Sequence, residues 1–141
     1  RGTPTLEAAL SVLAGRFPGR VATRIGFDER LARRIYAGSD FFLMPSRFEP
    51  SGLGQMIAMR YGTIPIARAT GGLIDSIEDG KTGFLFEQPT AAALGKALQT
   101  ALQCYQNEPQ FQQMRSNCFR KNFDFKNAAR SYLELYQQLA K

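Results

Sequence analysis

One loop of this sequence joins an acidic residue to glycines at the expected start of a helix. The loop reads Glu49-Pro50-Ser51-Gly52-Leu53-Gly54 and follows a compact apolar run. Free backbone N–H groups at a helix start, together with the positive end of the helix dipole, can hold a phosphate without a metal ion or a lysine. Glycine lets the backbone approach such an anion closely. The loop could therefore bind an anion beside a carboxylate.

A second glycine loop, Thr70-Gly71-Gly72, follows another short apolar run. In an open parallel sheet, ligands collect beyond the carboxyl ends of the strands, so the two loops would face one crevice. By spacing alone, glycines at a helix start are more often ordinary turn residues than a phosphate site, and Glu49 alone would be a surface acid. The choice between these interpretations depends on the elements that position the loops.

Strands and helices alternate along most of the chain. Short alternating or apolar runs predict strands at residues 21–25, 41–44, 64–67 and 83–86. Helical spacing and capping residues predict helices at 4–15, from 29 onward, and at 52–61, 91–105, 109–120 and 127–139. Gly62 is expected to end the helix before it as a left-handed cap. The pattern predicts an α/β fold with a doubly wound, Rossmann-like parallel sheet and a helical carboxy-terminal tail at 89–141.

The predicted sheet is small, and the first helix has no strand ahead of it. We therefore expect at least one further strand upstream, so that the sheet would be truncated at its amino-terminal edge. In the tail, apolar stripes at helical spacing are expected to be core rather than ligand sites. One stripe holds Leu94, Leu98, Ala101, Leu102 and Tyr105, and the other holds Tyr132, Leu135, Tyr136 and Leu139.

Composition narrows the classes of function. The chain has 141 residues, 44% hydrophobic and 21% charged, which is the balance of one globular domain. No apolar run approaches the roughly 20 residues that cross a bilayer, so we expect no membrane partner. The net charge of +6 is scattered, apart from Arg30, Arg33 and Arg34 on a helical segment. A solvated helix face explains that group better than a nucleic-acid site does.

Several kinds of catalytic centre are excluded or disfavoured. The sequence has no His, which rules out a Ser-His or Cys-His pair within this chain. It also lacks a tight acidic cluster, so we expect no metal site and no bound cofactor. Cys104 and Cys118 lack the paired spacing of a zinc or redox motif and are interpreted as reduced packing residues.

Five stretches together resemble a known family. They are Ile25-Gly26-Phe27-Asp28-Glu29, Asp40-Phe41-Phe42-Leu43-Met44-Pro45-Ser46-Arg47-Phe48-Glu49-Pro50, Gly52-Leu53 with Gln55, Tyr61-Gly62-Thr63-Ile64-Pro65, and Ala69-Thr70-Gly71-Gly72-Leu73. In this series the chain resembles the starch and glycogen synthases, which are retaining glycosyltransferases of the GT-B type with two facing Rossmann-like domains. The resemblance covers nearly the full chain and is strongest between residues 25 and 73.

The resemblance implies that residues 1–141 are the carboxy-terminal, nucleotide-sugar-binding domain of such an enzyme. Glu49 would contact the hydroxyls of the donor glucose and would be needed for activity. The Gly52 and Leu53 amides would hold the diphosphate, with Gly54 beside them. The aromatic side chain of Phe27 would stack on the nucleotide base, and the Thr70-Gly71-Gly72 loop would face the same crevice.

The implied reaction transfers glucose from ADP-glucose to the non-reducing end of an α-1,4-glucan with retained configuration. ADP-glucose is then a donor substrate, and neither a metal nor a cofactor is implied. The missing amino-terminal domain of the same protein would supply the acceptor side, so the isolated chain is expected to be inactive. Storage-glucan chemistry and reduced cysteines suit a bacterial cytoplasm or a plastid.

The sequence departs from the family pattern in three places. Ser51 stands where the family usually has Cys, which leaves the backbone cradle intact. Ile57 stands where many broader retaining transferases have a second Glu, which favours a glucan synthase. No counterpart of the family's earlier phosphate-binding Arg and Lys is present. Another retaining glycosyltransferase, or a non-catalytic nucleotide- or glucan-binding module, therefore remains an alternative.

Overall fold

Three parallel strands form one sheet within residues 2–140, the part of the chain that the computed structural model describes, apart from the side chains at 127 and 128. The strands are β1 (Phe41–Met44), β2 (Ile64–Arg68) and β3 (Phe84–Phe86). Their order is β1-β2-β3, so β2 pairs with both neighbours and lies at the centre. Because all strands run the same way, their carboxyl ends meet at one edge of the sheet.

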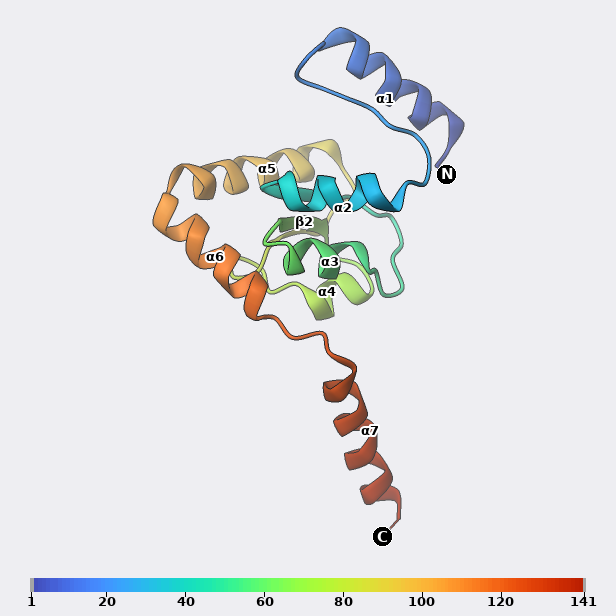
Figure 1. Cartoon of the computed structure of the whole chain (residues 1–141), viewed down its shortest axis with the longest axis vertical. Coiled ribbons are helices and arrows are strands. Elements are labelled where there is room, and N and C mark those ends of the chain that lie inside the picture. The colour runs from blue at the N-terminus through green and yellow to red at the C-terminus, as the bar shows by residue number, and fades with distance from the viewer. Residues whose placement is uncertain (1, 141) are drawn as a thin grey trace. The chain divides into compact units, whose positions relative to one another are not determined.

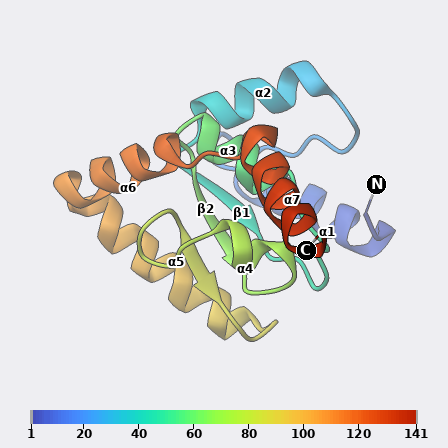
Figure 2. The ribbon, with the colours of Figure 1, turned by 90° about the horizontal axis from the view of Figure 1, so that it is seen from below.

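Helices precede, join and follow these strands. They are α1 (Pro4–Arg16), α2 (Glu29–Gly38), α3 (Gly54–Arg60), α4 (Gly72–Ser76), α5 (Ala91–Gln106), α6 (Glu108–Arg120) and α7 (Phe125–Leu139). In Figures 1 and 2, β2 lies between α3 and α5. Its first four residues are accordingly buried on both faces. The predicted doubly wound parallel α/β fold with a helical carboxy-terminal part is confirmed.

The chain divides into two compact units, residues 1–33 and residues 34–141. The first unit holds α1 and the segment at 21–25, where Thr23 Oγ1 donates to the carbonyl of Leu10 at 3.1 Å. The strand that we predicted at 21–25 is not formed, so that prediction is wrong. A strand needs the backbone of a neighbour to complete its hydrogen bonds, and none of the described residues pairs with this segment.

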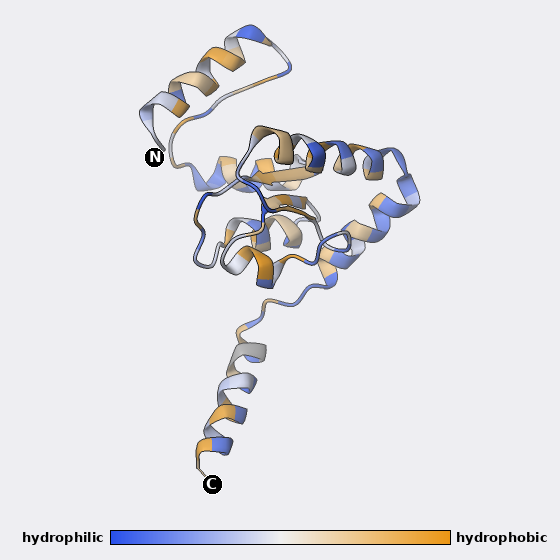
Figure 3. Ribbon diagram, turned by 180° about the vertical axis from the view of Figure 1, so that it is seen from behind, coloured by the Kyte–Doolittle hydropathy of each residue, from blue (hydrophilic) through white to orange (hydrophobic). Residues whose placement is uncertain are grey.

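The core lies between the sheet and the helices of the second unit. Side chains from β2 and from the ends of α3 and α4 are fully shielded, including Met59, Ile64, Ile66 and Leu73. The partly or wholly buried aromatic rings of Phe41, Phe84 and Phe111 pack above β1 and β3, together with the ring of Tyr105. Figure 3 shows the same arrangement as hydrophobic colour on the strands and hydrophilic colour along most of α6.

The apolar stripe that we predicted as core in the last helix is exposed. Tyr132, Leu135, Tyr136 and Leu139 of α7 are 59%, 47%, 62% and 75% exposed. Periodicity correctly predicted an amphipathic helix, but it does not show what covers the apolar face. In the other stripe, Ala101 is buried, whereas Leu102 is 56% exposed.

Cys104 and Cys118 are free and buried, as predicted for packing residues. Burial raises the pKa of the Cys118 thiol to about 12, and the thiol donates to the carbonyl of Thr82 at 3.2 Å. Because the thiolate is the reactive form, we expect iodoacetamide to leave Cys118 unmodified at about pH 8 in the folded chain and to alkylate it in urea. Intact-mass measurement over time gives the extent of alkylation.

The exposed position Thr100 on α5 offers a control, because Thr100→Cys places a thiol on the same fold in contact with solvent. That thiol should react in the folded chain. Alkylation of Cys118 at the rate of the introduced thiol, without unfolding, would contradict the burial described here.

Candidate functional site

The two loops singled out in the sequence meet at the carboxyl edge of the sheet. The first follows β1 and the second follows β2. The backbone N–H of Gly72 donates to the carbonyls of Glu49 and Pro50, in both cases at 3.2 Å. The loops are therefore held against each other by their backbones, as their positions after neighbouring parallel strands predicted.

The glycines of the second loop are required by this contact. A Cβ on Gly71 would lie 1.9 Å from the Glu49 carbonyl oxygen, and a Cβ on Gly72 would lie 2.6 Å from that of Ser51. Gly71 also has a φ of 48°, which a side chain disfavours. The N–H of Gly72 is thus already used inside the chain. The expected roles of Thr70, Gly71 and Gly72 in substrate binding stay predictions.

The first loop turns at Gly52, which has a φ of 75° and therefore cannot be helical. This explains why α3 begins at Gly54 and not at Gly52, where we expected it. A Cβ on Gly52 would lie 2.5 Å from Oε1 of Gln55, so a side chain there would disturb the turn itself. Loss of binding in a Gly52 variant would not by itself locate a ligand.

Gln55 links the turn to the neighbouring short helix α4. Its side chain is fully buried, and Nε2 donates to the Gly52 carbonyl at 2.9 Å and to Ser76 Oγ at 3.0 Å. Ser76 Oγ in turn donates to the Gly72 carbonyl at 2.8 Å. In the sequence, Gln55 stands out only as a member of one of the five stretches that carry the resemblance. Its structural role follows from a buried amide placed between two loops, which spacing alone does not reveal.

The backbone after the turn presents unsatisfied donors. Within the described chain, the N–H groups of Gly52, Leu53 and Gly54 donate to no other group. Such free amides at the start of a helix suit an anion. Gly54 also allows close packing, since a Cβ there would lie 3.1 Å from the ring of Phe42. Of the three residues, Leu53 is 68% exposed, Gly54 is partly exposed and Gly52 is buried.

Glu49 lies half-buried in the same loop. Its Oε2 accepts a hydrogen bond from Ser46 Oγ at 3.3 Å. No Lys or Arg among residues 2–140 forms an ion pair with it. The carboxylate can therefore accept hydrogen bonds from the hydroxyl groups of a ligand. A ligand that combines an anionic part with a polyhydroxylated part would match both sets of groups.

Phe27 belongs to the unit formed by residues 1–33 and is 97% exposed. Within the unit formed by residues 34–141, the structure brings together Glu49, the Gly52-Leu53-Gly54 turn and the Thr70-Gly71-Gly72 loop. The expected stacking of Phe27 on a nucleotide base stays a prediction.

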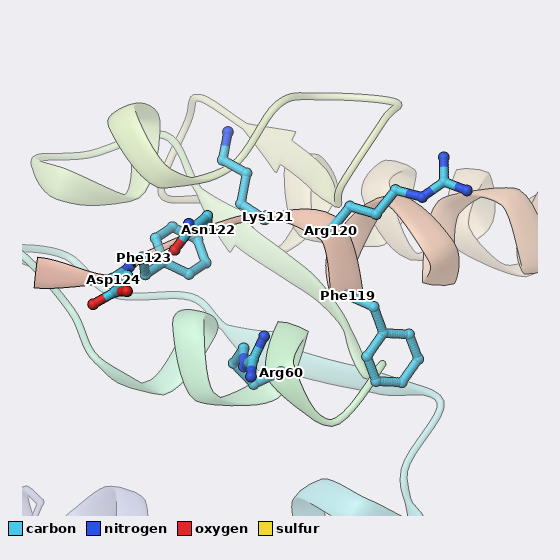
Figure 4. A pocket seen from close by; sticks show the side chains of 7 residues that line it. All are labelled: Arg60, Phe119, Arg120, Lys121, Asn122, Phe123 and Asp124. Carbon is cyan, nitrogen blue, oxygen red and sulfur yellow. Dashed lines mark hydrogen bonds between the residues drawn. The ribbon is translucent and has the colours of Figure 1, made fainter. Parts of the chain in front are cut away.

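A separate hollow of about 550 Å³ lies where α6 ends. It is lined by Arg60, Phe119, Arg120, Lys121, Asn122, Phe123 and Asp124. Figure 4 shows that the side chains of Phe119, Arg120 and Lys121 point in different directions. Lys121 is also engaged by Glu78 at 2.5 Å, and this pairing lowers the pKa of the Glu78 carboxyl. Of the cations that line the hollow, Lys121 is therefore already paired within the chain.

Two features are absent from the described part of the chain. No three His, Cys, Asp or Glu side chains gather there in a way that could hold a metal ion. Of the helices in that part, none is both long enough and apolar enough to cross a bilayer.

Comparisons with known proteins identify the family of the chain. The model of the family described as Glycosyl transferases group 1 matches residues 22–119. A glycogen synthase of Pseudomonas syringae pv. syringae is 50% identical over 141 residues, covering 100% of this chain and 29% of that protein. The chain thus spans under a third of the length of this relative.

Two solved structures resemble the fold. The catalytic domain of starch synthase IV from Arabidopsis thaliana, bound to ADP and acarbose, superposes with a TM-score of 0.81 and 36% identity. The match covers 96% of this chain and 30% of that one. A sucrose-phosphate synthase from Thermosynechococcus elongatus gives a TM-score of 0.72 and 26% identity, over 99% of this chain and 35% of that one.

The loop contact gives a prediction for the chain itself. Gly71→Ala should destabilise it by about 1–3 kcal/mol, because the new Cβ meets the Glu49 carbonyl and the backbone is strained. Gly95→Ala is the matched control, since Gly95 lies inside α5 with nothing within 4 Å of a Cβ. It should stabilise the chain by about 0.5–1 kcal/mol. Thermal unfolding followed by circular dichroism measures both. A Gly71→Ala chain as stable as the original would show that the loops do not pack this closely.

Proposed function

The chain belongs to the group 1 family of glycosyl transferases, and from this we propose that it forms the donor-binding part of a longer glucan synthase. In this proposal, residues 1–141 are the carboxy-terminal Rossmann-like domain, and 89–141 form its helical tail. An amino-terminal domain of the same protein would complete the cleft and bind the acceptor. The chain alone would then have no transferase activity.

We propose that the complete enzyme transfers glucose from ADP-glucose to the non-reducing end of an α-1,4-glucan. The presence of the Glu49 carboxylate and the free amides of Gly52, Leu53 and Gly54 on one loop carries this proposal. Support for the donor comes from the ADP bound to the related starch synthase IV. The close likeness to bacterial glycogen synthases favours a storage glucan as product and a bacterial cytoplasm as its place.

The geometry suits departure of a nucleoside diphosphate. As the bond between the anomeric carbon and the diphosphate oxygen breaks, negative charge grows on the phosphate. Fixed N–H donors at Gly52, Leu53 and Gly54 would stabilise that charge without reorganising. The acceptor hydroxyl then forms the new bond on the same face of the sugar, and its proton passes to the leaving diphosphate. Retention follows without a protein nucleophile.

Glu49 would orient the sugar rather than attack it. Its carboxylate is held by Ser46 on one side and accepts hydrogen bonds from the glucose hydroxyls on the other. Orientation of this kind matters because a small displacement of the reacting atoms lowers the rate steeply. The same proposal includes stacking of the Phe27 ring on the nucleotide base.

We expect Glu49→Gln in the complete enzyme to lower turnover about 10- to 150-fold, because a hydrogen bond to a charged group contributes about 1.5–3 kcal/mol. The melting temperature should change little, since Glu49 makes no ion pair with the described residues. Incorporation of labelled glucose from ADP-glucose into glycogen gives the rate.

Glu134→Gln on the exposed α7 serves as the control, because it also removes one carboxylate and should leave the rate unchanged. UDP-glucose is tested as donor beside ADP-glucose. A Glu49→Gln enzyme with the original rate but a lowered melting temperature would assign Glu49 to structure. Preference for UDP-glucose, or no transfer to glycogen, would refute the proposed reaction.

A further inference from the structure

Arg68 occupies the centre of the sheet edge at which the two loops meet. It is the last residue of β2, the central strand, and its side chain is half-buried. Its guanidinium Nε donates to the Ser46 carbonyl at 2.7 Å, and Nη2 donates to the Arg47 carbonyl. Nη1 reaches the Glu87 carbonyl at 3.5 Å. One side chain therefore spans the segments that follow β1 and β3.

The partners of Arg68 are all backbone carbonyls. Among the described residues, no carboxylate lies within ion-pair distance of its guanidinium. A planar fork of several N–H donors fits such a set of acceptors, whereas the ammonium of a lysine is a compact group on a flexible stem. These hydrogen bonds therefore fix the path of the backbone at residues 46, 47 and 87. Pairing with an opposite charge does not explain the position of Arg68.

The course of this backbone determines where the Glu49 carboxylate lies. Ser46 joins the two interactions, because its carbonyl accepts from Arg68 and its hydroxyl donates to Glu49 Oε2 at 3.3 Å. The Glu49 backbone is held separately by the N–H of Gly72. Removal of the fork would free residues 46 and 47 and release the side chain of Glu49, but it would leave the Gly72 contact in place.

We propose that Arg68 is a positioning residue that sets the orientation of the Glu49 carboxylate through the backbone and hydroxyl of Ser46. This inference rests on the proposed function, in which Glu49 orients the donor sugar. The diphosphate would meet the amides of residues 52–54, which are held through Gln55 and not through Arg68. Loss of Arg68 should therefore affect turnover much more than nucleotide affinity.

A double-mutant cycle in the complete enzyme tests this inference. Arg68→Met should lower kcat about 10- to 100-fold while the Kd for ADP changes less than about threefold. In the Glu49→Gln background, the same substitution should lower kcat less than about threefold, because no carboxylate remains to be positioned. Arg68→Lys should lose most of the rate as well, since it keeps the charge but not the fork.

Arg120→Met is the control, because it removes an exposed arginine that forms no ion pair among the described residues. It should leave kcat unchanged. An equal loss from Arg68→Met in both backgrounds would show a general structural role and overturn the inference, as would full activity of Arg68→Lys. If Arg68→Met does not fold, Arg68→Lys takes its place in the cycle. An equal loss of kcat in both Glu49 backgrounds would again overturn the inference. Full activity of Glu49→Gln itself would refute the role of Glu49 first and this inference with it.

Discussion

The backbones of two loops approach so closely at the sheet edge that neither Gly71 nor Gly72 has room for a Cβ. At this distance the N–H of Gly72 donates hydrogen bonds to the carbonyls of Glu49 and Pro50. The position of the acidic loop is thereby tied to the end of β2. The parallel sheet makes the contact possible, because it delivers the ends of β1 and β2 to the same edge.

Two polar side chains extend this contact into a site with a defined shape. Gln55 holds the Gly52 turn against α4, and Arg68 holds the backbone ahead of Glu49. Both side chains make several hydrogen bonds within the chain, and these bonds fix the conformation of the loop that follows β1. A neutral hydrogen bond such as those of Gln55 contributes about 0.5–1.5 kcal/mol, and one from a charged group such as Arg68 about 1.5–3 kcal/mol. Together these bonds select one loop conformation.

Much of this arrangement follows from local sequence patterns. The runs at 41–44, 64–67 and 83–86 are short, mostly apolar and bounded by turn residues, so their identity as strands is local information. The positions of Glu49 and the glycines after strand ends then predict a shared edge. Gly62, with a φ of 75°, forms the expected left-handed cap.

Other features depend on contacts that spacing does not contain. The segment at 21–25 has the alternation of a strand, but none of the described residues pairs with it. The apolar face of α7 is exposed in the described part of the chain. The short helix α4 has too few residues to show a helical period. The roles of Arg68 and Gln55 come from partners up to 22 residues away in sequence. Periodicity shows which residues share one face of a helix or strand. These features depend instead on which residues of other elements contact that face.

The most direct test of the central claim is a crystal structure of the complete enzyme with ADP bound. The account predicts that the diphosphate lies against the N–H groups of Gly52, Leu53 and Gly54, with the Glu49 carboxylate facing the space that the donor glucose would occupy. ADP bound away from this turn, for instance in the hollow beside Arg60 at the end of α6, would contradict it.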